Sequence, residues 1–373
     1  MTLTALLICH LKARAVMEMT REGYCDYTAL NLNCGCPLPK VANKGAFGAS
    51  LMENPDLVKR LCRNMWEGCS TELPVTVKCR IGTDSTTESE LYSNLKRFIE
   101  TIADDGIVSD FQVHARIAVL NKKFSPAQNR NIPPLKHDFV TRLVRDFPEL
   151  SFSLNGGVET LNQAREHLDA CPGLAGVMVG RSMIASPWNW AMSDQLIYKE
   201  KDGCDKQRWN ILRAYGNHAD REESLWGTKI RRMIVKAVTG LFAGEPNAKK
   251  WRIGLDQIAA LPKKYAEKGL LDPTPLSEHI LTLASTCFTS EILERTAEES
   301  YQIILDQESK GDASKVISDW HNARIRTHPS STEKLAHDDV ELSGKKESNQ
   351  QSDETQIDED KRYAEEASFK SLG

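Results

Sequence analysis

Cys36 is the first side chain whose setting suggests chemistry. It stands in the run Asn31-Leu-Asn-Cys-Gly-Cys-Pro37, between a glycine and a proline at the end of a predicted strand. A thiol on such a stiff turn can act as a nucleophile or as a proton donor. Most cysteines are buried and structural; we assign Cys34 and Cys79 to that class and give Cys36 a functional role. No second cysteine pair of ligand spacing follows Cys34 and Cys36, so we expect no metal.

Two pairs of cationic side chains follow at the ends of the next two strand-like runs. Alternation along a strand sends Lys78 and Arg80 to one face, and His114 and Arg116 likewise share a face. Buried cations need a counter-charge. An anionic ring system or a phosphate would supply it, and a structural salt bridge or a structural histidine is the alternative that spacing leaves open. The two pairs together predict a cation-rich rim.

Glycine turns follow the last two strand-like runs, in Leu154-Asn-Gly-Gly-Val158 and Val177-Met-Val-Gly-Arg181. Glycine lets backbone N–H groups and helix N-termini approach a phosphate closely, and Arg181 adds positive charge. Two such turns on consecutive strands predict the phosphate site typical of flavin-binding barrels. The sequence lacks a Gly-x-Gly-x-x-Gly run, the motif that would indicate a dinucleotide site instead.

Positioning these residues requires a sheet of parallel strands. Short β-branched or apolar runs alternate with helical periodicity between residues 28 and 181, at spacings typical of βαβ units. The predicted strands are 28–33, 75–81, 110–115, 151–154 and 176–179. The predicted helices between them are 56–66, 89–103, 137–145 and 160–169. Polar residues at the strand ends fit the rim of a (βα)8 barrel, where active sites are built.

Five strands are too few for a closed barrel of this type, which needs eight. A single amphipathic helix precedes the first strand, and its predicted apolar face comprises Leu11, Ala15, Val16 and Met19. We therefore expect an α/β fold over residues 1–187, a TIM-type (βα)8 barrel without its first three or so strands. Helices predominate afterwards and predict an all-helical domain over 188–312. They are 182–198, 206–219, 228–242, 248–260, 276–288 and 297–310.

Charge is distributed unevenly along the 373 residues, which carry 48 Lys and Arg against 52 Asp and Glu. Residues 201–270 hold 15 basic and 8 acidic side chains. This positive excess could bind a polyanion, and an ordinary solvated helical surface is the alternative. Residues 328–373 hold 12 acidic and 6 basic side chains, so we expect a disordered acidic tail over 313–373. No apolar run is as long as a membrane span, and the ten cysteines show no disulfide framework. These features predict a cytoplasmic protein with reduced thiols; organellar targeting stays open.

Six motifs occur in the order seen in the tRNA-dihydrouridine synthases, and the chain resembles that family. They are Asn31-Leu-Asn-Cys-Gly-Cys-Pro37, Val77-Lys-Cys-Arg-Ile-Gly82, His114-Ala-Arg116, Asn129-Arg-Asn-Ile-Pro-Pro-Leu135, Leu154-Asn-Gly-Gly157 and Gly176-Val-Met-Val-Gly-Arg181. The segment 129–135 is similar to the A subfamily, the tRNA-dihydrouridine(20/20a) synthases. Residues 240–252 resemble the family's tRNA-binding bundle, and the similarity covers about residues 11–290.

The resemblance implies an FMN-dependent reduction of the uracil C5–C6 bond in the D-loop of tRNA, with NADPH reducing the flavin. It implies that Cys36 is the acid that protonates C5. The residues that it assigns to the flavin are Lys78, His114, Asn155, Gly156, Gly157, Gly180 and Arg181. Those that it assigns to tRNA are Asn33, Arg116, Arg130, Lys249 and Arg252. The expected partner is tRNA, bound by a monomer without a metal or a membrane.

The chain also departs from the family's pattern. Only residues 1–10 stand where the family has its first three barrel strands, and Ile117 replaces the usual Lys or Ser after His-Ala-Arg. If residues 1–373 are the whole molecule, we expect poor FMN retention and exposed sheet edges. Two other functions stay open: a truncated, non-catalytic tRNA-binding remnant, and a small-molecule FMN barrel of the dihydroorotate dehydrogenase type. The basic helical segment is an argument against the second of these.

Overall fold

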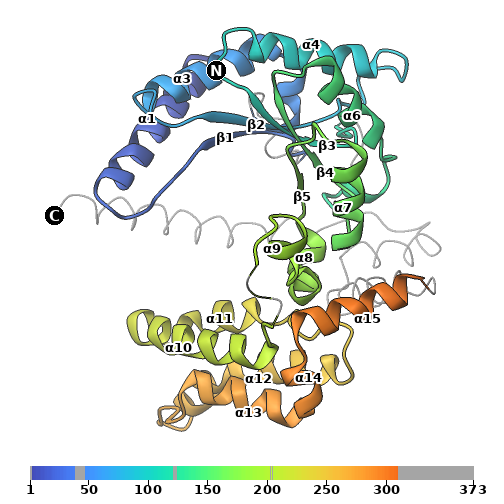
Figure 1. Cartoon of the computed structure of the whole chain (residues 1–373). Coiled ribbons are helices and arrows are strands. Elements are labelled where there is room, and N and C mark those ends of the chain that lie inside the picture. Colours follow the sequence, from blue (N-terminus) through green and yellow to red (C-terminus); the bar gives the residue numbers. More distant parts are fainter. Residues whose placement is uncertain (1, 38–46, 121–123, 202, 204, 310–373) are drawn as a thin grey trace, which may run out of the picture. The chain divides into compact units, whose positions relative to one another are not determined.

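Five parallel strands form one sheet, in the order β1-β2-β3-β4-β5, in the computed structural model (Figure 1). The structure describes residues 2–37, 47–120, 124–201, 203 and 205–309. The strands are β1 (Leu30–Cys34), β2 (Val75–Arg80), β3 (Asp110–His114), β4 (Ser151–Asn155) and β5 (Gly176–Met178). Each of them lies within two residues of a predicted strand, which confirms the parallel α/β pattern.

Helices connect successive strands. They are η1 (Gly48–Glu53), α3 (Pro55–Gly68), α4 (Leu91–Ala103), α5 (Gln128–Asn131), α6 (His137–Asp146) and α7 (Leu161–Ala170). Local chemistry sets where two of them begin. The side chain of Asn54 accepts from the N–H of Leu57 at the start of α3, and Thr160 accepts from the N–H of Gln163 at the start of α7. Such caps satisfy backbone donors that have no partner within the helix.

The two faces of the sheet differ in chemistry. One face packs its apolar side chains against α3, α4 and α6, and these side chains are Leu32, Val77, Cys79, Phe111, Val113, Phe152 and Leu154. The opposite face is polar: the Asn31 amide donates to Thr76 Oγ1 and to Gln112 Oε1, at 2.7 Å each. Strands that follow in sequence order, with helices on one face, are typical of barrel winding rather than of a doubly wound sheet. Within the described residues, β1 and β5 each have one neighbouring strand.

Helix α1 (Thr2–Arg21) packs against α3, but not on its predicted face. Ala13 and Met17 are buried, whereas Leu11 and Met19 are 50% and 42% exposed. The backbone of α1 comes so close to α3 that a Cβ on Gly68 would lie 2.4 Å from the carbonyl oxygen of His10. The prediction of the Leu11 face was wrong, because the contact runs along small side chains that let two backbones approach.

Within the described residues that follow β5, the named elements are helices. They are α8 (Arg181–Ala185), η2 (Pro187–Trp190), α9 (Ser193–Leu196), α10 (Arg208–Trp226), η3 (Thr228–Ile230), α11 (Arg231–Ala237), α12 (Ala248–Ala266), α13 (Leu276–Cys287), α14 (Ser290–Glu294) and α15 (Ala297–Ser309). The single helix predicted over 182–198 is three short ones, and the first of them ends before Pro187, which cannot continue it. Their core includes Trp251 and the stacked rings of Phe242 and Phe288, whose centroids are 3.9 Å apart.

The described residues all fall within one compact unit, Met1–Trp320, so the domain boundary at 187/188 stays a prediction. The predicted tail, 313–373, lies outside the described residues. Among the residues that are described, no helix is long and apolar enough to cross a bilayer. In the same residues, no group of three or more His, Cys, Asp or Glu side chains could hold a metal ion.

Candidate active site

Cys36 lies two residues beyond the carboxyl end of β1, on a turn that hydrogen bonds hold from both sides. The side chain of Asn33 accepts from the N–H of Gly35 at 3.0 Å, and the carbonyl of Cys36 accepts from the N–H of Ala49 at 2.8 Å. The Cys36 side chain is half-buried. Cys34 is fully buried, and burial raises the pKa of its thiol well above the ordinary value. The neighbouring thiols therefore differ: Cys34 is held neutral inside the core, whereas Cys36 remains accessible.

Arg80 fastens the Cys36 turn to two other segments. It is 2% exposed, and its guanidinium donates to the carbonyl oxygens of Gly35 at 3.0 Å, Ile117 at 2.8 Å and Asn129 at 2.9 Å. Burial first, and then the charge of Arg130, lowers the pKa of Arg80 to about 10. Three neutral acceptors thus take the place of the salt bridge that spacing left open.

Lys78 and Asn155 meet across the polar face of the sheet. The ammonium of Lys78 donates to Asn155 Oδ1 at 3.0 Å, and the Asn155 amide donates to the carbonyl of Met178 at 2.7 Å. Burial, followed by the charge of Arg80, lowers the pKa of Lys78. Two side chains that lie 77 positions apart in the sequence are therefore joined at the carboxyl ends of β2 and β4.

His114 ends β3 beside the first glycine turn. Burial lowers its pKa to about 3, and the charges of Arg80, Lys78, Arg116 and Arg181 lower it further in that order. The imidazole is therefore neutral near pH 7. A Cβ on Gly156 would lie 2.4 Å from the ring Cδ2 of His114, and φ of Gly156 is +106°. Glycine is required here both by the backbone conformation and by the close approach of the ring.

Three further arginines converge where the loop after β3 meets the end of β5. Asn131 joins two of them: its side chain accepts from Arg181 at 2.8 Å, and its carbonyl accepts from Arg116 at 3.4 Å. Arg116 also donates to the carbonyl of Pro133. The Nε atoms of Arg116 and Arg130 are buried and have no partner among the described residues. We call Lys78, Arg80, Arg116, Arg130 and Arg181 the cation cluster.

The two remaining predicted glycines differ in their surroundings. Gly157 has φ of +79°, and a Cβ there would lie 2.4 Å from Leu135. A Cβ on Gly180 would meet no atom within 4 Å, so the space beside Gly180 is open. The turn at Gly180 therefore exposes backbone beside Arg181, whereas Gly157 is packed against Leu135.

Lys249 and Arg252 lie apart from the cation cluster, near the start of α12. They are three residues apart and so share a helix face, on which Lys249 is exposed and Arg252 is half-buried. Neither is paired with a carboxylate among the described residues.

Sequence reasoning missed Asn129 and Asn131 as organisers of this site. Asn129 is completely buried, and its side chain accepts from the N–H of Val119 at 2.8 Å and donates to the Val119 carbonyl at 3.2 Å. The asparagines of the segment 129–135 were a signal for this role, because a buried side-chain amide must find a partner for its NH2 group and another for its oxygen.

The parallel sheet therefore has a thiol and a cluster of cations at its carboxyl edge, where the active sites of barrel enzymes are built. The chain matches the model of the dihydrouridine synthase family over residues 6–276. It therefore belongs to the dihydrouridine synthase family, whose members are flavin-dependent TIM-barrel enzymes.

Curated relatives agree with this assignment. A tRNA-dihydrouridine(20/20a) synthase of Vibrio cholerae is 39% identical over 236 residues, which are 63% of this chain and 68% of that protein. The protein of the same name from Escherichia coli K12 is 40% identical over 233 residues, 62% of this chain and 64% of its own length. The relative from Shewanella oneidensis is 39% identical over 233 residues and 65% of its length. The chain thus spans about two thirds of these relatives.

The cluster's donors fit a flavin phosphate. A phosphate accepts several hydrogen bonds, and the guanidinium of Arg181 follows the open space beside Gly180. The buried Nε atoms of Arg116 and Arg130 also lack acceptors among the described residues and are available to a second anionic group. Gly180 offers backbone directly before Arg181, and Gly156 brings its turn against the His114 ring. Glu159 is the acidic group whose charge acts on Arg181, and it forms no described ion pair with it. The positive charge is left largely uncompensated, as an anionic cofactor requires.

Proposed function

We propose that this chain reduces uridine to 5,6-dihydrouridine in the D-loop of tRNA, at position 20 or 20a, with FMN as cofactor and NADPH as reductant. The names of the relatives support the nucleotide position, and the resemblance of the motifs supports NADPH. We further propose a monomeric state and a cytoplasmic location.

One observation carries the proposal. The accessible thiol of Cys36 and the cation cluster lie at the carboxyl ends of neighbouring parallel strands, in a chain of the dihydrouridine synthase family. Active sites of barrel enzymes are built at that edge. Arg80 links the two features directly, because it belongs to the cluster and holds the carbonyl that precedes Cys36.

Each group has a definite part in the reaction. Reduced FMN, when bound, supplies the hydride that is added to C6 of the uracil ring. The Cys36 thiol supplies the proton that is added to C5, so that one hydride and one proton saturate the double bond. Lys78, joined to Asn155, and neutral His114 would hold the flavin ring and ribityl chain, and the turns at Gly156 and Gly180 would hold its phosphate with Arg181.

The RNA is held from two places. Asn33 and Arg130 contact the target uridine or its flanking backbone, and Arg116 contributes charge beside them. The uridine must leave its stack to reach these groups. Lys249 and Arg252 bind the backbone of the tRNA through their shared face of α12.

Cys36→Ala tests the chemical step, with Cys34→Ala as the matched control two residues away. The assay adds NADPH and FMN to unmodified tRNA and measures dihydrouridine by mass spectrometry. We expect Cys36→Ala to lower the rate about a hundredfold or more, the usual contribution of a general acid, and Cys34→Ala to retain the wild-type rate if it remains folded. Equal rates for Cys36→Ala and wild type would remove Cys36 from the mechanism. A wild-type chain that binds tRNA and reduces none of it would refute the proposed activity.

Lys249→Ala and Arg252→Ala test the RNA contact, with the exposed Arg97 of α4 replaced by Ala as the control. Each bundle variant should weaken tRNA binding and lower the slope of log affinity against log salt by about one. The Arg97 variant should leave that slope unchanged. Slopes that are equal in all three variants would exclude α12 from the RNA interface.

A further inference from the structure

Gly240 lies against the carboxyl end of α8, the helix that contains Arg181. A Cβ on Gly240 would lie 2.5 Å from the carbonyl oxygen of Ala185 and 2.8 Å from that of Ile184. Both atoms belong to the backbone, so neither can rotate away as a side chain could. Any side chain at position 240 would therefore have to move one of the two segments.

Space, rather than backbone conformation, is the reason for glycine here. Gly240 is absent from the glycines with positive φ, so an alanine can adopt its φ without strain. Replacing Gly240 by alanine thus tests the contact with α8 and little else.

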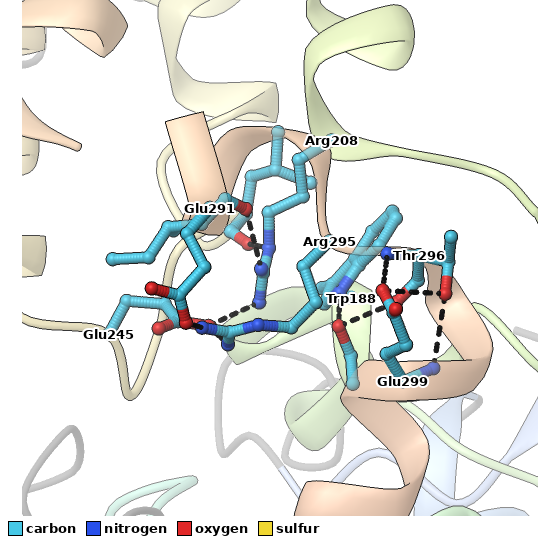
Figure 2. Close-up of polar contacts among 10 residues, drawn as sticks. Trp188, Arg208, Glu245, Glu291, Arg295, Thr296 and Glu299 are labelled. Atoms are coloured by element: carbon cyan, nitrogen blue, oxygen red, sulfur yellow. Dashed lines mark hydrogen bonds and ion pairs between the residues drawn. The ribbon is translucent and has the colours of Figure 1, made fainter. Parts of the chain in front are cut away.

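Arg208 holds the segment that follows Gly240, and Figure 2 shows Arg208 beside its carboxylate partner Glu245. Arg208 is 2% exposed; its Nε donates to the carbonyl of Leu241 at 3.3 Å, and another nitrogen donates to Glu245 at 2.8 Å. Its guanidinium lies 4.8 Å from the ring centroid of Trp188, which in turn donates to the Ser300 hydroxyl at 2.8 Å. This network holds the segment of Gly240, whereas α8 begins beside the open space at Gly180. We therefore expect an added methyl group to shift α8.

The displacement would point toward Arg181. The last carbonyl groups of a helix are directed along its axis, so a group that presses on Ile184 and Ala185 pushes α8 toward its other end. An increase from 2.5 Å to an ordinary contact near 3.4 Å requires a shift of about 0.9 Å. Binding sites tolerate displacements of only about 0.5 Å. Gly180 and Arg181 would move with α8, and Arg181 would leave the position in which it donates to the side chain of Asn131.

We propose that Gly240 is a positioning residue for the phosphate of the flavin, which it governs through α8 without touching the cofactor. This inference rests on the proposed function, since it takes Gly180 and Arg181 as ligands of that phosphate. It assigns to the helical part of the chain a role in cofactor selection in addition to RNA binding.

The test compares FMN with riboflavin, which has the same ring and ribityl chain but no phosphate. Dissociation constants are measured on the full chain by flavin fluorescence. Gly240→Ala should weaken FMN binding about tenfold or more while riboflavin binding changes little, because a misplacement near 1 Å affects only the phosphate contacts. Gly216→Ala is the control: its Cβ would lie 2.9 Å from the Cβ of Ser277, a comparably tight contact that does not involve α8. This control should keep the wild-type ratio of the two constants.

The possible failures are distinguishable. A wild-type chain that binds neither flavin overturns the proposed function and this inference together. A wild-type chain that prefers FMN, with Gly240→Ala showing the same preference, overturns the inference alone, and so does an equal loss of both flavins in a variant that remains folded. If Gly240→Ala does not fold, Arg208→Lys replaces it, since lysine cannot bridge Leu241, Glu245 and Trp188 at once. An unchanged FMN preference in a folded Arg208→Lys chain overturns the inference.

Discussion

Replacement of Arg80 by lysine should destabilise the chain through the loss of hydrogen bonds rather than of charge. Arg80 joins the carbonyls of Gly35, Ile117 and Asn129, and so ties together the Cys36 turn, the loop after β3 and helix α5. The lysine ammonium keeps the charge but lacks the planar fork that reaches three separated oxygens. A hydrogen bond from a charged donor contributes about 1.5 kcal/mol or more, so the loss of two predicts about 3 kcal/mol.

Urea unfolding at pH 7 measures this difference. The control is Arg60→Lys, on an exposed position of α3, which should change the free energy of unfolding by less than about 0.5 kcal/mol. Arg80→Lys should lower the midpoint clearly and leave the slope with urea unchanged. If the two variants unfold at the same urea concentration, the three carbonyl contacts do not stabilise the fold as argued.

Three more predictions concern single groups. The pKa of His114 is about 3 when folded against an ordinary 6.5, so the unfolded chain binds more protons between these values and stability falls as the pH drops through that range. From pH 7 to pH 5 the free energy of unfolding, measured in urea, should fall by about 2 kcal/mol more in the wild type than in His114→Asn. Equal decreases in the two proteins would contradict the lowered pKa. Gly156→Ala should destabilise by roughly 1–3 kcal/mol and weaken flavin binding, because its φ of +106° and the His114 ring both oppose a side chain; a wild-type melting temperature would argue against this. The Asp272 carboxylate is buried beside Arg231 and His279; burial alone would raise its pKa, but hydrogen bonds from these two partners lower it. Asp272→Asn should therefore lower the free energy of unfolding by several kcal/mol. A value within about 0.5 kcal/mol of wild type in urea would show that these ion pairs do not stabilise the fold.

Local patterns were sufficient for the parts of the site that lie on strands and turns. Alternation placed Lys78 on the polar face of the sheet and Cys79 in the core, and the structure agrees. The turn at Gly156 was predicted from residue type alone, and its positive φ is what only glycine adopts readily. Pro187 likewise marked a helix end that the longer prediction over 182–198 overlooked.

What the sequence by itself determined, then, is the order of strands and helices, the thiol at the end of the first strand and the sign of the charge at the sheet's edge. These features depend on neighbours in the chain and on periods of two or 3.6 residues, which a sequence displays directly. Only the tertiary structure decided that Lys78 meets Asn155, that Arg80 holds the carbonyl before Cys36, that α1 turns Ala13 rather than Leu11 inward, and that Gly240 abuts α8. Such contacts join residues far apart in the chain at distances near 3 Å, and they follow from how the elements pack rather than from any one element's own pattern.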